Sequence, residues 1–90
     1  MEKKWVVYIL ECGDGTLYTG VTDNLERRFD QHVRGKGAKY TRGRGPLTIR
    51  CVHPCADRGE ALKKEAAIKR MPRSEKQRLC RLWQENQIKT

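Results

Sequence analysis

Two runs of β-branched and aromatic residues near the start of the chain predict a β-hairpin. The first run spans Trp5–Leu10 and the second Thr16–Val21, and Gly13-Asp14-Gly15 between them is typical of a tight turn. Tyr8 and Tyr18 would then lie on paired strands, where two phenols can be presented close together. Tyrosines are also common as half-buried partners across a hairpin, so the pair by itself does not indicate a function.

The pattern that follows the hairpin predicts an amphipathic helix over residues 24–34. Its apolar positions recur at helical spacing, at Leu25, Phe29 and Val33. Asp23 is expected as the N-cap, with Glu26 three residues later in the capping-box position. Arg28 and His32 are one turn apart and lie beside the apolar stripe, so both should border the buried face. Such a pair is also common as solvated side chains at the edge of a helix.

Residues 35–46 contain four glycines and four basic residues, a composition that predicts no regular element. The basic residues are Lys36, Lys39, Arg42 and Arg44, and Tyr40 is the aromatic residue among them. A flexible backbone with exposed cations and one aromatic ring suits a loop that follows a phosphate backbone while stacking on a base. Leu47–His53 then predicts a third strand.

A second helix is predicted from Asp57, its N-cap, to about Met71, before Pro72 ends it. Glu60 takes the capping-box position, and the apolar stripe is formed by Ala61, Leu62 and Ile68. Glu65 falls inside this stripe. A carboxylate that faces a core is costly unless it is paired or holds a metal ion. Two interpretations therefore stay open for Glu65, namely a metal ligand or a buried ion pair with Arg28 as a candidate partner.

A short third helix is predicted after Pro72, with Ser74 and Gln77 at capping-box spacing. Its apolar side consists of Leu79, Leu82 and Trp83. Residues 85–90 lack periodicity and predict a frayed tail. A chain of 90 residues is long enough for a single domain with a modest core, which we expect over about residues 4–84.

The charge of the chain is unevenly distributed. The net charge is +9, with 20 Lys and Arg against 11 Asp and Glu. Residues 1–26 carry a net −3, whereas residues 27–50 carry eight basic residues against Asp30 alone, a net +7. Such a basic segment is typical of nucleic-acid binding, and it includes Arg27 beside the four cations of the glycine-rich loop. A solvated basic face, or attraction to an anionic membrane surface, is the simpler alternative.

The four cysteines form no CxxC motif and no framework typical of small secreted domains. Cys51, His53 and Cys55 alternate on the predicted third strand, so a zinc site is conceivable, but Pro54 interrupts the run and no spaced fourth ligand is evident. The sequence has no apolar run long enough to span a bilayer and no signal-peptide pattern. We therefore expect a soluble, unprocessed cytoplasmic protein with free thiols and no membrane partner.

A set of motifs in one order resembles the GIY-YIG nuclease family, most closely its small single-domain bacterial members. The set consists of Tyr8, Tyr18-Thr19-Gly20, Asn24-Leu25-Glu26-Arg27-Arg28, His32 and Glu65. Two departures are visible. The name-giving triplets read Val6-Val7-Tyr8 and Tyr18-Thr19-Gly20 instead of Gly-Ile-Tyr and Tyr-Ile-Gly, and Pro72-Arg73-Ser74-Glu75 stands where many members have an asparagine.

The resemblance implies an α+β fold in which helices flank a small three-stranded antiparallel sheet. It also implies a nuclease that hydrolyses phosphodiester bonds through a one-metal site. Tyr18 would help to deprotonate an attacking water, and Tyr8 would be its hydrogen-bonding neighbour. Arg28 would orient the phosphate, His32 would assist by hydrogen bonding or proton transfer, and Glu65 would hold Mg²⁺ or Mn²⁺. A phenol with the ordinary pKa of about 10 is protonated at neutral pH, so a tyrosine base needs a cationic neighbour.

Two other functions fit parts of the sequence. A non-catalytic nucleic-acid-binding module would explain the basic segment and the missing asparagine, and a protein-interaction domain would use the basic face on acidic partners. DNA is the expected substrate before RNA. Small domains of this kind often take their specificity from a protein partner, and no heptad or long apolar patch predicts an oligomer.

Overall fold

The computed structural model describes residues 4–88. It contains three strands, three α-helices and one short 3₁₀-helix. In chain order these are β1 (Trp5–Glu11), β2 (Leu17–Thr22), α1 (Leu25–Val33), η1 (Lys39–Thr41), β3 (Thr48–Cys55), α2 (Arg58–Lys69) and α3 (Arg73–Ile88).

The three strands form one antiparallel sheet in the order β2-β1-β3, which confirms the α+β fold expected from the sequence. Because β1 is central, β3 is an edge strand and continues through Pro54, a residue that an edge strand tolerates. The register opposes Tyr8 to Gly20 and Leu10 to Tyr18. Tyr8 and Tyr18 therefore lie diagonally across the pair, on the same face of the sheet.

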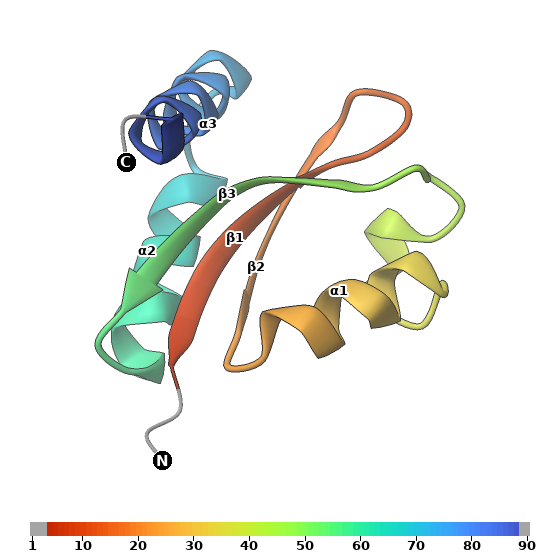
Figure 1. Ribbon diagram of the computed structural model, residues 1–90, viewed down its shortest axis with the longest axis horizontal. Coiled ribbons are helices and arrows are strands. Elements are labelled where there is room, and N and C mark those ends of the chain that lie inside the picture. The colour runs from red at the N-terminus through yellow and green to blue at the C-terminus, as the bar shows by residue number, and fades with distance from the viewer. Residues whose placement is uncertain (1–3, 89–90) are drawn as a thin grey trace.

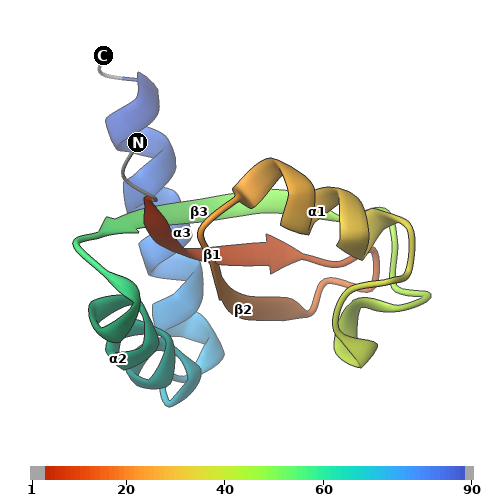
Figure 2. The ribbon, with the colours of Figure 1, turned by 90° about the horizontal axis from the view of Figure 1, so that it is seen from below.

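The helices divide between the two faces of the sheet, with α1 on one side and α2 and α3 on the other (Figures 1 and 2). The apolar core lies on the α2 and α3 side. It consists of Val7, Ile9, Cys51, Ala61, Ile68 and Cys80. Alternation along β1 places Tyr8 on the opposite face, toward α1. The sheet thus packs its apolar face on two helices and leaves the tyrosine face for α1 and the loop after it.

The helix starts agree with the sequence pattern at α2 and differ at α1. Asp57 caps α2 as predicted, and its Oδ1 accepts the backbone N–H of Glu60 at 2.8 Å. The predicted cap of α1 was Asp23, but the N-cap is Asn24, whose Oδ1 accepts the N–H of Arg27 at 3.1 Å. Both residue types are good caps, so neighbouring candidates could not be separated from the sequence alone.

Three apolar residues assigned to buried stripes are exposed instead, namely Val33 (59%), Leu62 (38%) and Leu82 (47%). In α1 the fully buried residue is His32, so the helix turns a polar side chain toward the sheet. In α2 the buried face is formed by Ala61 and Ile68. Glu65 lies on that face, with its side chain 20% exposed, as the helical count predicted.

The third helix differs most from its prediction. α3 begins at Arg73, so Ser74 lies inside the helix and is not its cap. It is 16 residues long and includes residues 85–88, for which the sequence suggested a frayed tail. Residues 89 and 90 lie outside the described residues. Leu79 and Trp83 pack against the core, as expected, together with Cys80.

The structure also bears on the cysteine and membrane predictions. All four cysteines are free thiols. Within residues 4–88 no group of three His, Cys, Asp or Glu side chains is arranged to hold a metal ion, so Cys51, His53 and Cys55 do not form the beginning of a zinc site there. In the same residues no helix has the length and apolar character needed to cross a membrane.

Candidate active site

The polar face of the sheet gathers four of the predicted site residues into one cluster. The Tyr8 hydroxyl lies 2.9 Å from Nε2 of His32 in a buried contact between β1 and α1. The Tyr18 ring contacts both, with centroids 6.3 Å from Tyr8 and 5.2 Å from His32. Arg28, one turn before His32, is half-buried and donates through Nη1 to Oε1 of Gln31 at 3.1 Å.

The hydrogen bonds around His32 determine where its proton resides. Thr41 Oγ1 donates to the carbonyl oxygen of Ala38 at 3.0 Å, which uses its only hydrogen. The same oxygen lies 2.8 Å from Nδ1 of His32, so it must accept from an Nδ1–H. In the neutral ring Nε2 is then an acceptor, and Tyr8 donates to it. The three hydrogen bonds, from Tyr8 to His32, from His32 to Thr41 and from Thr41 to Ala38, therefore all donate in the direction from the sheet to the loop.

Burial is the main cause of the pKa shifts of Tyr8 and His32. Burial raises the pKa of the Tyr8 phenol, a hydrogen bond from Arg28 opposes the increase, and the negative charge of Glu65 adds to it. Burial lowers the pKa of His32, and the positive charge of Arg28 lowers it further. Both shifts favour the neutral forms. A neutral Tyr8 that donates to a neutral His32 is therefore the resting arrangement.

Two glycines make room for the pair. A Cβ at Gly20 would lie 2.5 Å from the Tyr8 hydroxyl, and a Cβ at Gly37 would lie 2.4 Å from Nδ1 of His32. Gly20 belongs to the Tyr-Thr-Gly triplet, which the sequence identified. Gly37 appeared in the sequence only as one glycine of a flexible loop. Both positions exclude any larger residue because their neighbours are the rings of the cluster.

Glu65 lies on α2, on the other side of the sheet from α1. Its carboxylate is close enough to Tyr8 to raise the pKa of the phenol. The predicted ion-pair partner was Arg28, but Oε2 of Glu65 pairs with Nζ of Lys69, one turn later, at 3.5 Å. Lys69 is 54% exposed, whereas the Glu65 side chain is 20% exposed. Lys69 is therefore the partner of Glu65 in place of Arg28, and the i,i+4 spacing of Glu65 and Lys69 on the helix indicates this pair.

The glycine-rich loop is fastened to the hairpin and is not the free segment that its composition suggested. It contains the 3₁₀-helix η1, and the N–H of Gly13 donates to the carbonyl of Arg44 at 2.5 Å. Arg44 also pairs with Asp14 at 2.7 Å and lies over the Tyr40 ring, 4.7 Å from its centroid. Contacts over a long sequence separation fix the loop, and local composition does not reveal them.

This loop places Tyr40 next to the candidate site. The Tyr40 and Tyr18 ring centroids are 5.8 Å apart, and Tyr40 is 42% exposed. The predicted nucleic-acid contacts Lys36, Lys39, Arg42 and Arg27 are also exposed. Arg42 donates from Nε to the carbonyl of Gly35 at 3.2 Å. The structure thus places the Tyr40 ring beside Tyr18, with Arg44 over the Tyr40 ring. No pattern in the sequence indicates Thr41, whose role depends on the folded loop.

Comparisons with known proteins identify the family of this chain. The family model described as the GIY-YIG catalytic domain matches residues 4–78. A UPF0213 protein of Oceanobacillus iheyensis is 51% identical over 79 residues, which cover 88% of this chain and 92% of the relative. A UPF0213 protein of Nitratidesulfovibrio vulgaris is 53% identical over 75 residues, which cover 83% of this chain and 68% of the relative.

Two solution NMR structures are also similar. The UPF0213 protein BH0048 from Bacillus halodurans superposes with a TM-score of 0.58 at 44% identity, covering 88% of this chain and 84% of that one. The protein EF2693 from E. faecalis superposes with a TM-score of 0.64 at 36% identity, covering 92% and 88%. The family match over most of the chain, the identity to these relatives and the shared fold lead to one conclusion: this chain belongs to the GIY-YIG catalytic domain family.

Proposed function

We propose that the chain is a metal-dependent nuclease that hydrolyses phosphodiester bonds, with DNA as its preferred substrate. The observation that carries the proposal is the single cluster formed by Tyr8, Tyr18 and His32, with Arg28 in electrostatic reach. These residues come from β1, β2 and α1 and are the ones that the family resemblance assigns to catalysis.

The two tyrosines have different surroundings and so different proposed roles. Tyr8 is 1% exposed and donates its hydroxyl proton to His32, so it would hold the imidazole in place. Tyr18 is half-buried and is the phenol that can contact an attacking water. Tyr18 would accept the proton of that water, and the guanidinium of Arg28 would bind a phosphoryl oxygen.

A divalent metal ion is compatible with the residues present. Mg²⁺ keeps several waters and is commonly bound by one or two carboxylates together with substrate phosphates. Glu65 supplies one half-buried carboxylate whose charge acts on Tyr8, and its partner Lys69 is a long, exposed side chain that can turn to solvent. Glu65 would therefore hold the ion. When bound, Mg²⁺ or Mn²⁺ supplies charge neutralisation at the phosphate and stabilises the leaving oxygen.

Substrate binding would use the exposed cations and ring beside this cluster. Lys36, Lys39 and Arg42 would contact phosphates, with Arg27 on α1 and Arg44 at the loop end. Tyr40 would stack on a base, since its ring is exposed and already held by Tyr18 and Arg44. A protein partner would supply further sequence or structure specificity.

The test is cleavage of labelled single-stranded, duplex and branched DNA, and of RNA, by the purified chain in Mg²⁺, Mn²⁺ or EDTA. Glu65→Ala is run alongside, with Glu85→Ala as the matched control on α3. We expect cutting that requires metal, persists in Glu85→Ala and is lost in Glu65→Ala. Cutting that is unaffected by both EDTA and Glu65→Ala would overturn the metal-dependent proposal.

One observation favours a second candidate, a nucleic-acid-binding module that does not cut. The ion pair with Lys69 already compensates the Glu65 carboxylate without a metal ion. Pro72-Arg73-Ser74-Glu75 also lacks the asparagine found in many family members. Two results together would favour this module over the nuclease. One is nucleic-acid binding without cleavage under every condition, and the other is the absence of Mn²⁺ binding that depends on Glu65.

A further inference from the structure

Much of the positive charge lies outside the basic segment at residues 27–50. Residues 51–90 contain ten Lys and Arg against five Asp and Glu, a net +5. None of these cations belongs to the tyrosine cluster or the glycine-rich loop. Several of them are on α3, the long helix behind the sheet.

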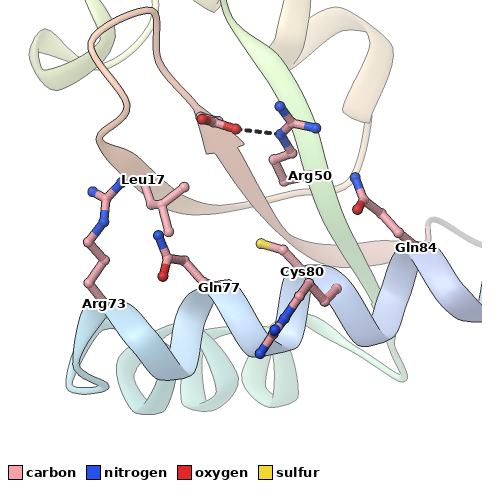
Figure 3. Close-up of a pocket in the computed structure, with 8 residues that line it drawn as sticks. Leu17, Arg50, Arg73, Gln77, Cys80 and Gln84 are labelled. Atoms are coloured by element: carbon pink, nitrogen blue, oxygen red, sulfur yellow. Dashed lines mark hydrogen bonds and ion pairs between the residues drawn. The ribbon is translucent and has the colours of Figure 1, made fainter.

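Two adjoining hollows line the contact between α3 and the hairpin. One is bounded by Thr16, Leu17, Tyr40, Arg73 and Lys76. The other shares Leu17 and Arg73 with it and continues along α3 past Gln77, Arg81 and Gln84, with Arg50 of β3 opposite. We call the two together the α3 groove. Figure 3 shows Arg73 and Gln77 extending from α3 toward Leu17, and Arg50 on the strand across from Cys80.

The lining of the α3 groove is cationic. It includes Arg50, Arg73, Lys76 and Arg81, whereas its acidic member is Glu11, which already pairs with Arg50 at 2.5 Å. Arg73 is held in place, since its Nη2 donates to the carbonyl of Gly15 at 2.6 Å. The amides of Gln77 and Gln84 add uncharged donors. Spaced cations with neutral donors between them fit a row of phosphates better than a single small anion.

The α3 groove begins at the candidate active site. Tyr40 lines its first hollow and packs on Tyr18, with the ring centroids 5.8 Å apart. A strand whose reacting phosphate lies at the tyrosine cluster would therefore meet Thr16 and Arg73 as it passes the end of the hairpin. We propose that the α3 groove binds the phosphodiester backbone of the nucleic-acid strand on one side of the scissile bond. The inference rests on the proposed function, because it extends the same substrate site.

The α3 groove is tested by removing its charge and comparing oligonucleotides of two lengths. The variant Arg73→Gln/Lys76→Gln/Arg81→Gln is measured against Lys63→Gln/Arg70→Gln/Arg78→Gln, which removes the same charge from exposed positions outside the groove. Binding of fluorescein-labelled DNA of about 6 and about 20 nucleotides is followed by anisotropy over a salt series. The molecule is about 30 Å across, so the longer probe can occupy the cluster and the whole groove together, whereas the shorter one covers less of the groove.

We expect the groove variant to lose about tenfold or more in affinity for the long probe, with a shallower salt dependence by about 0.7 per lost phosphate contact. Its loss of affinity for the short probe should be smaller, because that probe covers less of the groove. Equal losses in the two triple variants at both lengths would overturn the inference. Because Arg73 also bonds the hairpin, Lys76→Gln/Arg81→Gln serves as the second variant if thermal unfolding shows that the triple variant does not fold.

The outcome separates this inference from the proposed function. A parent that binds the long probe through α3 but never cuts would refute the nuclease and leave the groove standing. A parent that cuts DNA while the groove variant binds and cuts like the control would refute the groove and leave the nuclease standing. A parent that binds neither DNA nor RNA would refute both.

Discussion

The Tyr8 hydroxyl donates a hydrogen bond to Nε2 of His32 across 24 residues of sequence, at 2.9 Å and out of contact with solvent. Thr41 fixes its direction by accepting from the other ring nitrogen. Tyr8 of the sheet, His32 of α1 and Thr41 of the loop are therefore joined by consecutive hydrogen bonds that fix the tautomer of the imidazole. These hydrogen bonds organise the tyrosine face of the sheet.

Replacing Thr41 with Val should disturb His32 while preserving the volume of the side chain. The buried Nδ1–H would lose its acceptor, at a cost of about 1–3 kcal/mol in unfolding free energy. The imidazole would also be free to adopt the other tautomer, in which Tyr8 has no acceptor. Urea unfolding and the ¹⁵N chemical shifts of the His32 ring measure the two effects. Thr41→Ser should retain both properties, and Thr48→Val, at an exposed position, is the control. An unchanged tautomer in Thr41→Val would contradict the assignment.

The two tyrosines should respond differently to loss of their hydroxyls. Tyr18→Phe should lower the cleavage rate by about 10²–10⁴-fold, the usual contribution of a general base, while DNA affinity stays near that of the parent. Tyr8→Phe should also reduce stability by about 1–3 kcal/mol, since Nε2 of the buried His32 loses its donor. Single-turnover cleavage, anisotropy and urea unfolding separate the effects. Parental cutting by Tyr18→Phe would show that the base is another group.

The fold should weaken in mild acid because of His32. Burial and the charge of Arg28 lower its pKa, so the unfolded chain, with an ordinary histidine pKa of about 6.5, takes up a proton more readily than the folded chain. The stabilisation is thus complete above about pH 6.5 and is lost as the pH falls below it. The pKa of His53 is also lowered, by burial and by Lys64, and contributes in the same direction.

Urea unfolding at intervals between pH 8 and pH 5 measures this dependence. His32→Gln should flatten the decline, leaving the part due to His53, and His53→Gln should leave the part due to His32. An equally steep decline in His32→Gln would indicate that groups other than this imidazole cause the acid sensitivity.

Alanine at either glycine of the cluster should be costly for steric reasons. The new Cβ would lie 2.5 Å from the Tyr8 hydroxyl in Gly20→Ala and 2.4 Å from His32 Nδ1 in Gly37→Ala. Forcing these rings aside should cost about 1–3 kcal/mol and lower the cleavage rate. At Gly45 a Cβ would meet no atom within 4 Å, so Gly45→Ala is the control and should change stability by less than about 0.5 kcal/mol. Equal stability of all three variants would contradict the packing argument.

Local patterns in the sequence determined the hairpin, the cap of α2, the place of Glu65 on its helix and the family motifs. Those features depend on residues within a few positions of one another, where alternation, helical spacing and capping chemistry act directly. The same patterns misplaced Val33, Leu62 and Leu82, because several faces of a helix can look apolar and only packing selects the buried one.

Tertiary structure alone decided the rest. His32 became the buried residue of α1 because the sheet face above it presents Tyr8 as a donor, and Thr41 became its partner because the loop folds back on the hairpin through Gly13 and Arg44. These contacts join residues from separate elements, and their free energy depends on burial that exists only after the elements pack. The sequence by itself thus determined which chemical groups are available, and the packed fold determined which of them meet.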